Sequence, residues 1–360
     1  MTFFLKSHQI VVSMNKMIYD VFRFFNELDL LEIRLNLLYG HVDKFILVEA
    51  TTTYSGIPKP LYYLRNTKRF AKFKDKIVHI IVDDLPRSSK DRWPAEVAQR
   101  MATMRGLTDA QDGDIVIISD LDEIWNPKAL PANITAPVVF QQKAKAFYLN
   151  ARHDREWLGS IAIPYKQYKK ERVIKVPVKN VFDTLRLRRK KLEKIVNGGW
   201  HWSYLGGKEK IIYKIESFAH SEFDNEEWKA AWVGMGERQK ENCYLPPEND
   251  PDWPQWLKDN WKNYPNLVNN SMQTQKKKNA LSLNNVSTLD FILKKHSLGK
   301  KSKAVKIYGT RHGTLPTIFR QLGFTIGAEI GVAQGYFSKH LLRYVPNLKL
   351  YSIDAWKLFN

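Results

Sequence analysis

Three short runs of aliphatic and β-branched residues constrain the fold of this chain more than any other feature. They cover residues 44–50 (KFILVEA), 76–84 (KIVHIIVDD) and 114–120 (DIVIISD), and polar or turn-forming residues follow each run. Such runs are typical of strands that are buried on both faces of a parallel sheet. Before the third run, residues 93–110 contain Pro94 in a first helical turn and then repeat apolar side chains at helical spacing. The sequence therefore predicts an α/β fold with a mostly parallel, doubly wound sheet.

Composition divides the 360-residue chain into three parts. Residues 1–268 alternate between apolar runs and helical patterns, as a globular α/β domain does. Residues 269–304 are rich in Asn, Ser, Gln and Lys, which is typical of a linker. Residues 305–360 return to an α/β pattern of strand, glycine-rich turn, amphipathic helix and strand. We expect a large domain, a polar linker and an incomplete second domain.

The formal net charge of +20 favours anionic partners: nucleotide sugars, phosphorylated glycolipids, membrane surfaces or nucleic acids. The single cysteine, Cys243, excludes a disulfide framework or a cysteine-based zinc site within one chain, and it favours a reducing compartment. Residues 1–14 lack the roughly 20 apolar residues of a membrane span and make a poor signal peptide. We therefore expect a cytoplasmic protein, with contact to a membrane surface left open.

The third apolar run ends in the carboxylates Asp120, Asp122 and Glu123. In an extended segment, residues two apart project to the same side, so Asp120 and Asp122 point together from the strand end. Ligands of open parallel sheets bind at the carboxyl ends of strands, and converging carboxylates suit Mg²⁺ or Mn²⁺. Such an ion would neutralise a departing diphosphate in sugar transfer from a nucleoside diphosphate sugar. The alternative is an Asp-rich turn that caps the next element.

Two other functions stay open on these residues. Haloacid-dehalogenase-like phosphatases also place two aspartates two residues apart after an apolar strand, usually early in the domain and followed by Gly and Thr. Here Glu123 and Ile124 follow Asp122. A basic nucleic-acid-binding protein would explain the net charge, but the sequence shows no motif of that class, so we expect no nucleic-acid partner.

Five sequence blocks together resemble glycosyltransferase family 17 and keep its motif order from about Ile18 to about Tyr244. The blocks are residues 24–63, 92–107, 114–127 (DIVIISDLDEIWNP), 197–207 (NGGWHWSYLGG) and 215–223 (IESFAHSEF). The resemblance implies a GT-A-like nucleotide-binding fold, inversion at the anomeric carbon and a UDP-sugar donor, with N-acetylglucosamine as the favoured sugar. It also implies that Asp120 and Asp122 bind the metal.

The sequence departs from the family pattern at two points. Trp125 stands where we expect proline, and the chain shows no anchor, whereas the vertebrate enzyme is a Golgi membrane protein. The acceptor is therefore not tied to an N-glycan core, and a bacterial or viral surface glycan is the expectation. The oligomeric state is left open.

Three residues are candidates for contacts with the donor nucleotide. Glu49 ends the first apolar run and suits contact with the base or ribose, although it also fits a simple strand-end turn. Arg100 and Arg105 lie on the helix that leads to the aspartates. An arginine there could hold diphosphate oxygens with two parallel hydrogen bonds, or it could simply be exposed.

The remaining polar candidates are a third metal ligand and a general base. His220 lies in the fifth block and is assigned to the metal or to the diphosphate, with a structural histidine as the alternative. Inverting transfer needs a carboxylate that takes the proton of the acceptor hydroxyl. Glu216, in the same block, and Asp84, after the second run, both fit this role, and the sequence does not choose between them.

Trp200, Trp202 and Tyr204 alternate in the fourth block, so we expect them on one face of a strand. Aromatic faces bind the C–H-rich faces of sugars, which makes these residues candidates for substrate contact. The alternative is ordinary core packing.

Residues 328–342 (AEIGVAQGYFSKHLL) resemble the first motif of class I S-adenosylmethionine methyltransferases. Gly331 and Gly335 lie at a strand-to-helix turn, and Asp354 ends the next strand, where that family places a ribose-binding acid. A glycine-rich turn in any Rossmann-like domain is the alternative. Because several strands of such a domain do not follow, we expect no methylation by this part alone and S-adenosylmethionine binding only in a longer parent protein.

Overall fold

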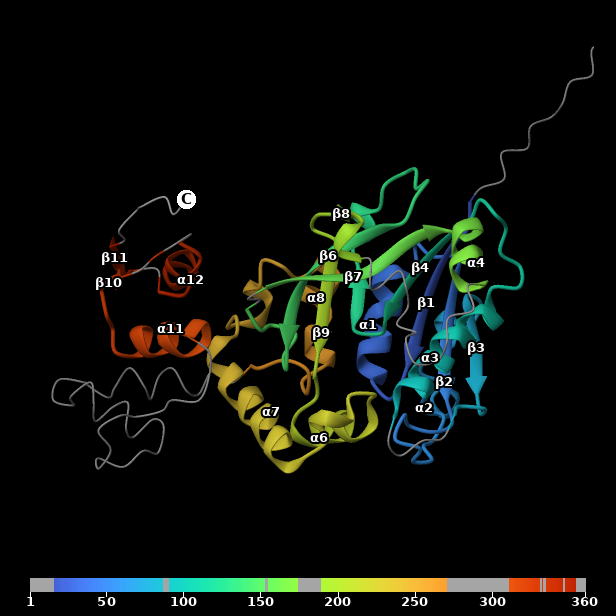
Figure 1. Ribbon diagram of the computed structural model, residues 1–360, viewed down its shortest axis with the longest axis horizontal. Helices are drawn as coiled ribbons and strands as arrows, with labels where there is room; N and C mark the ends of the chain where they lie inside the picture. The colour runs from blue at the N-terminus through green and yellow to red at the C-terminus, as the bar shows by residue number, and fades with distance from the viewer. Residues whose placement is uncertain are drawn as a thin grey trace, which may run out of the picture. The chain divides into compact units, whose positions relative to one another are not determined.

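The computed structural model describes residues 16–86, 91–152, 155–173, 189–270, 311–330, 332, 335–345 and 347–353 (Figure 1). The chain divides into two compact units, Met1–Ser271 and Met272–Asn360. Residues 271–304, which make up most of the expected linker, lie outside the described residues, so the linker stays a prediction. None of the described helices combines the length and apolar character that a bilayer crossing requires.

The first unit is built around one nine-stranded sheet with helices between its strands. The strands are β1 (Ile18–Phe24), β2 (Lys44–Ala50), β3 (Ile77–Val82), β4 (Ile115–Asp120), β5 (Glu123–Trp125), β6 (Val138–Ala146), β7 (Arg155–Pro164), β8 (Glu193–Ile195) and β9 (Gly199–Ser203). The helices are α1 (Leu28–Leu38), α2 (Tyr62–Arg65), α3 (Trp93–Ala102), α4 (Tyr165–Val173), α6 (Lys208–Ser217), α7 (Glu226–Gln239) and α8 (Gln255–Asn260). The three apolar runs are confirmed as β2, β3 and β4.

The sheet is mixed, so the expectation of a mostly parallel sheet is wrong. Its strand order is β3-β2-β1-β4-β7-β6-β9-β5, with β8 beside β6. The first four strands are parallel. In the rest of the sheet β7 runs antiparallel to β4 and β6, and β5 runs antiparallel to β9, while β8 and β9 run parallel to β6. The sequence signal for this half is different, because β6 (VVFQQKAKA) mixes apolar with polar residues instead of forming one apolar run. Strands of that kind suit antiparallel pairing.

Two of the parallel strands differ from expectation for reasons that the topology explains. β3 is only half-buried, because it lies at the edge of the sheet. β1 lies in the middle of the parallel half, yet its sequence (IYDVFRF) carries Asp20 and Arg23 and does not read as an apolar run. Asp20 is tolerated in this position because Arg34 of α1 pairs with it at 2.7 Å.

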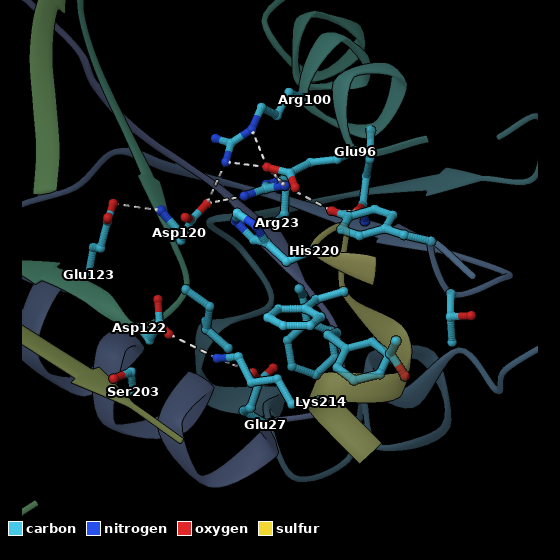
Figure 2. Close-up of a pocket in the computed structure, with 18 of the residues that line it drawn as sticks. Arg23, Glu27, Glu96, Arg100, Asp120, Asp122, Glu123, Ser203, Lys214 and His220 are labelled. Carbon is cyan, nitrogen blue, oxygen red and sulfur yellow. Dashed lines mark hydrogen bonds and ion pairs between the residues drawn. The ribbon is translucent and has the colours of Figure 1, made fainter. Parts of the chain in front are cut away.

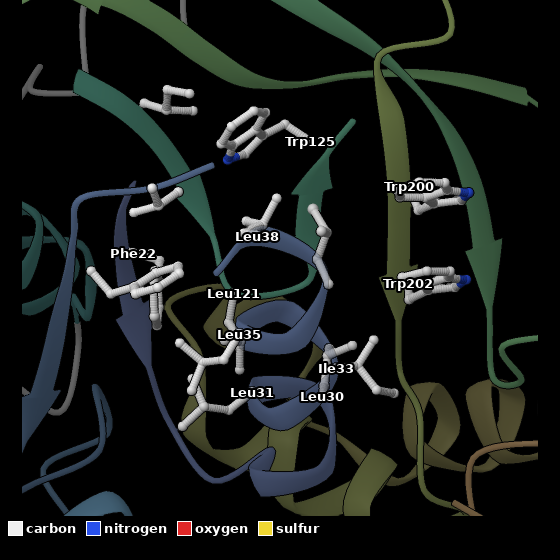
Figure 3. Packing of buried hydrophobic residues seen from close by; sticks show 14 of the residues in the cluster. Phe22, Leu30, Leu31, Ile33, Leu35, Leu38, Leu121, Trp125, Trp200 and Trp202 are labelled. Atoms are coloured by element: carbon white, nitrogen blue, oxygen red, sulfur yellow. The ribbon is translucent and has the colours of Figure 1, made fainter. Parts of the chain in front are cut away.

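Both faces of the sheet are covered. On one face, β1, β2 and β4 pack with α1 and with the segment that contains α8; Figure 3 shows part of this cluster, including Leu31, Leu35, Phe22 and Trp125. On the other face, Val21, Ile46 and Ile118 pack with α3 and α4. Alternate residues of each strand therefore enter different cores, and the polar carboxyl ends of β1, β2 and β4 remain at one edge of the sheet.

The second unit contains α11 (Arg311–Gln321), β10 (Ile326–Ile330), α12 (Tyr336–Tyr344) and β11 (Lys349–Ile353). β10 and β11 pair in parallel, and Phe337, Leu341 and Leu348 belong to a small separate core. The strand–helix–strand order agrees with the expected pattern. Gly331 and Asp354 lie outside the described residues, so a cofactor site at this turn stays a prediction.

Candidate functional site

A cavity of about 620 Å³ lies where β1, β2 and β4 end (Figure 2). Residues that follow each of these strands line it, among them Phe25, Thr52 and Asp122. The other walls come from α3, from β9 and from α6. The edge of a sheet at which parallel strands end is the usual place for a ligand site, so this cavity is the candidate site.

The buried side chain of Arg34 holds the backbone of the turn that carries Asp120 and Asp122. The Arg34 guanidinium donates to the carbonyl oxygens of residues 120, 121 and 123 at 2.9–3.1 Å and to both carboxylate oxygens of Asp20. Arg34 and Asp20 are both fully buried. Because each donor has a partner, the backbone of the turn is fixed before any ligand arrives.

Asp120 belongs to a network of alternating charges along one wall of the cavity. Arg23 of β1 donates to its carboxylate, and the Arg100 guanidinium lies 3.5 Å from the same oxygen. Glu96 of α3 joins these two arginines, at 3.1 Å from Arg23 and 2.7 Å from Arg100. Burial raises the pKa of Glu96, but the two arginines outweigh that effect and lower it. Tyr54 completes the network by accepting a hydrogen bond from Arg23 at 2.8 Å.

Asp122 faces a different set of partners across the cavity (Figure 2). Its carboxylate lies 3.0 Å from the Lys214 ammonium of α6 and 3.9 Å from the His201 ring of β9. Lys214 also approaches Glu27, at 3.7 Å. Burial acts to raise the pKa of Asp122, but Lys214 and His201 outweigh burial, so the pKa is lowered and the carboxylate is ionised.

Basic and acidic side chains line the cavity in nearly equal numbers. The basic residues are Arg23, Lys59, Arg100, Arg155, Arg189 and Lys214, and the acidic residues are Glu27, Glu96, Asp120, Asp122 and Glu123. A site with this balance carries no excess negative charge, so an anionic ligand such as a diphosphate can enter it and replace carboxylates as the partner of an arginine or lysine.

The two aspartates fit a divalent ion only together with a ligand. Across the segments that the structure describes, no three His, Cys, Asp or Glu side chains converge on one point. Asp120 and Asp122 nevertheless both open to the cavity, and their carboxylates are the hard oxygen donors that Mg²⁺ and Mn²⁺ prefer. Mg²⁺ commonly uses one or two carboxylates and completes its coordination with water and substrate phosphate, so the donor set fits that mode.

The residues expected from the sequence divide between the cavity and other places. Arg100, Asp120, Asp122, Tyr204 and His220 line the cavity. The other candidates, Glu49, Asp84, Arg105, Trp200, Trp202 and Glu216, are not among its lining residues.

Three of these other candidates pair within the protein and away from the cavity. Glu49 is fully buried and accepts from the backbone N–H of Tyr63 at 3.2 Å, with His79 at 3.0 Å. Asp84 and Arg105 form an exposed ion pair of 2.8 Å. The pKa of Asp84 is lowered by its hydrogen bond to Arg105.

The two base candidates and the candidate third metal ligand are also paired. Glu216 lies 2.9 Å from the ammonium of Lys229, while its neighbours Ser217 and Phe218 line the cavity. His220 does line the cavity, but its Nδ1 atom lies 2.7 Å from Glu222 and its ring packs edge-on against Trp93. Its place beside the Arg23 network suits contact with a diphosphate (Figure 2).

The expectation that Trp200, Trp202 and Tyr204 share one strand face is met only by the two tryptophans. Trp200 and Trp202 stack at 5.6 Å between ring centroids and pack in the core, as the alternative interpretation held (Figure 3). His201 and Ser203, on the opposite face of β9, line the cavity. The strand ends at Ser203, and Tyr204 has a φ of 54°, which turns its ring onto Trp232 in a different cluster.

Sequence reasoning missed several charged or polar residues of the cavity, among them Arg23, Glu27, His201 and Lys214. Arg23 could have been found, because recognising β1 as the neighbour of β4 places it opposite Asp120. His201 could have been found from the alternation of β9. Lys214 and Glu27 come from α6 and from the start of α1, and only the tertiary fold brings them to Asp122.

Comparison with known proteins gives the family of this chain. The model of glycosyltransferase family 17 matches residues 5–230. The β-1,4-mannosyl-glycoprotein 4-β-N-acetylglucosaminyltransferases of Homo sapiens and Rattus norvegicus are each 31% identical over 106 residues, which cover 28% of this chain and 20% of each relative. The enzyme of Mus musculus is 30% identical over the same length. The chain therefore aligns with only about a fifth of these relatives.

Proposed function

The chain belongs to glycosyltransferase family 17, and on that premise we propose that it transfers N-acetylglucosamine from UDP-N-acetylglucosamine to a glycan, with inversion and with Mn²⁺ or Mg²⁺. The observation that carries this proposal is the placement of Asp120 and Asp122 on one cavity with Arg23, Arg100 and Lys214. These groups provide a charged site for a nucleoside diphosphate at the end of the parallel strands.

The basic residues act on the leaving group in this proposal. In the transfer, the acceptor oxygen bonds to the anomeric carbon while the bond from that carbon to the diphosphate breaks. Negative charge then grows on the diphosphate. Arg23 and Arg100 donate to its oxygens from β1 and α3, and the Lys214 ammonium lies on the other side. Cationic donors that are already in place stabilise such charge without reorganisation at the moment of reaction.

Asp120 and Asp122 would hold the divalent ion together with the diphosphate. When bound, the ion would supply charge neutralisation to the leaving group. Both aspartates exchange partners in this proposal: their carboxylates turn to the ion, and the arginines and Lys214 turn to the phosphate oxygens. Arg34 keeps the backbone of the turn in place throughout, because it binds backbone carbonyl oxygens and the buried Asp20 and not the carboxylates that turn to the ion.

The sugar and the acceptor rest on the relatives rather than on the cavity. The matched relatives are named as acting on a mannosyl-glycoprotein and as transferring N-acetylglucosamine, but the match covers a fifth of their length. We propose a glycan acceptor in this chain and assign to Tyr204 and Trp232, which stack at 4.6 Å and line the cavity, the contact with a sugar ring.

A panel of nucleotide sugars with Mn²⁺ tests the proposal without knowledge of the acceptor. We expect slow hydrolysis of UDP-N-acetylglucosamine, and we expect UDP with Mn²⁺ to raise the melting temperature. Asp120→Ala removes both effects. Asp112→Ala is the matched control, because Asp112 is an exposed aspartate that precedes β4 and pairs with Lys169. If no nucleotide sugar is hydrolysed and UDP does not shift the melting temperature, the proposal is wrong.

A further inference from the structure

We infer that Glu27 is the general base of the transfer and that its Oε1 atom takes the proton of the acceptor hydroxyl. This inference rests on the proposed function and leaves the proposed donor and metal unchanged. It assigns the role that sequence reasoning left between Glu216 and Asp84. Those two carboxylates do not line the cavity, and ion pairs with Lys229 and Arg105 engage them.

The other carboxylates of the cavity are engaged by strong partners. Glu123 is buried, with Oε1 accepting from the Trp157 indole at 2.8 Å and Oε2 accepting from the backbone N–H of Asp120 at 3.1 Å. Glu96 lies between two arginines. Asp120 and Asp122 belong to the proposed metal and diphosphate site. Donors of this kind stabilise the ionised carboxylate and make it a weaker base.

Glu27 differs from these groups because no side chain of the described residues lies within hydrogen-bonding distance of its carboxylate. Its Oε2 atom accepts a weak hydrogen bond from the backbone N–H of Asn26 at 3.2 Å. Its Oε1 atom lies 3.7 Å from the Lys214 ammonium, beyond hydrogen-bonding distance, and has no closer polar partner among the residues that the structure describes. The side chain keeps 22% of its surface exposed and lines the cavity. An accessible oxygen of this kind is what a general base requires.

The position of Glu27 in the chain supports a functional role. It is the residue that precedes α1, where Ser, Thr, Asp or Asn normally caps a helix, and its side chain makes no capping hydrogen bond. Hydrogen-bond capping therefore gives no reason for glutamate at this position, although its charge suits the positive end of the helix dipole. The side chain instead reaches the cavity beside Lys214, whose ammonium group stands between Glu27 and Asp122. This arrangement places the base next to the diphosphate site and outside it.

The proton and electron balance of the step is simple. The acceptor O–H proton moves to Glu27 Oε1 as the acceptor oxygen bonds to the anomeric carbon. The bond between that carbon and the diphosphate oxygen breaks, and its electron pair leaves with the diphosphate. When water replaces the glycan, the same carboxylate takes a proton from water, so hydrolysis of the donor reports on the base.

The test compares Glu27→Gln with wild type in the hydrolysis of UDP-N-acetylglucosamine with Mn²⁺. Gln keeps the size of the side chain and removes its basicity, so we expect kcat to fall by about a hundredfold or more. The dissociation constant of UDP, measured by calorimetry with Mn²⁺, should stay within about twofold. Glu27→Asp keeps a carboxylate and should retain more activity than Glu27→Gln. Glu32→Gln is the matched control, since Glu32 lies on the same helix and pairs with Arg69.

Each alternative gives a different result. Wild-type rates in Glu27→Gln would overturn the inference, and so would a raised KM with an unchanged kcat, which would make Glu27 a contact of the donor sugar. Loss of UDP binding in both Glu27 variants would make the role structural. Absence of hydrolysis in the wild-type protein would instead contradict the proposed function, on which the inference depends.

Discussion

Two aspartate–arginine pairs, Asp20–Arg34 between β1 and α1 and Asp120–Arg23 between β4 and β1, have opposite surroundings. Asp20 and Arg34 are buried against the turn at residues 120–123, and neither side chain is exposed. Asp120 and Arg23 line the cavity, and their side chains are 27% and 13% exposed. The same ionic contact is therefore a buried support in one place and, in the proposed function, an exchangeable contact in the other.

The hydrogen bonds of the two arginines show the difference directly. All three nitrogens of the Arg34 guanidinium donate within the protein: to Asp20, to Ser119 and to three carbonyl oxygens. The Nε atom of Arg23 is buried and has no hydrogen-bond partner within the described residues. A buried donor without a partner is costly unless a ligand provides one. A phosphate oxygen would provide it.

The largest expected effect is loss of the buried pair. Arg34→Met leaves the buried Asp20 carboxylate without its cation and frees the turn at residues 120–123. We expect the free energy of unfolding to fall by about 3–5 kcal/mol. Urea denaturation measures it. Arg23→Met is the matched variant in the open pair and should cost clearly less. Equal losses in the two variants would contradict the distinction between the pairs.

The next largest effect concerns function. Asp122→Asn keeps the shape of the side chain but removes the charge that faces Lys214 and the proposed ion. We expect kcat for donor hydrolysis to fall by about a hundredfold or more, as for other losses of transition-state stabilisation. The stabilisation of the protein by UDP with Mn²⁺ should disappear in a thermal melt. Retention of both would exclude Asp122 from the site.

The same contrast explains how far the sequence alone could lead. The apolar runs of β2 and β4 predict the parallel half of the sheet and the position of Asp120 and Asp122, because local pattern and burial agree there. β1 escapes this reasoning, because Asp20 within it is compensated by Arg34 fourteen positions later in another element. The other half, with its parallel and antiparallel pairs, likewise depends on which strands meet, and its short segments do not encode that choice.

The same limit applies to the site: the sequence places residues of one segment together, but not residues that only the tertiary fold brings together. Asp120 and Asp122 come from one strand end, so residue spacing is enough to place them together. Lys214 and Glu27 reach Asp122 from α6 and α1, and no periodicity relates them. Trp200 and Trp202 illustrate the opposite case. The alternation that places them on one strand face fits core packing as well as substrate contact, and both residues lie in the core.

A moderate effect is expected from a conservative change in the open pair. Arg23→Lys keeps the charge but removes the planar fork that can bind two phosphate oxygens at once. We expect the dissociation constant of UDP to rise about tenfold, which corresponds to about 1.4 kcal/mol. Isothermal calorimetry with Mn²⁺ measures it. Arg65→Lys is a suitable control, since Arg65 is exposed on α2 and does not line the cavity. An unchanged constant would remove Arg23 from the diphosphate site.

The smallest expected effect is a pH dependence that belongs to the open network. Arg23 and Arg100 outweigh the effect of burial and lower the pKa of Glu96 below its usual value of 4.5. A carboxyl group with a lowered pKa in the folded protein stabilises the fold above its unfolded pKa, and it loses this contribution as pH falls through the folded value.

Comparison of wild type with Glu96→Gln isolates this contribution. The difference in free energy of unfolding should be about 1 kcal/mol near neutral pH and should shrink as the pH falls below 4.5, where the wild-type carboxyl group takes up its proton. Urea titrations at a series of pH values measure the difference. A difference in free energy of unfolding that stays constant down to the lowest pH would show that the ion pairs of Glu96 with Arg23 and Arg100 do not stabilise the fold.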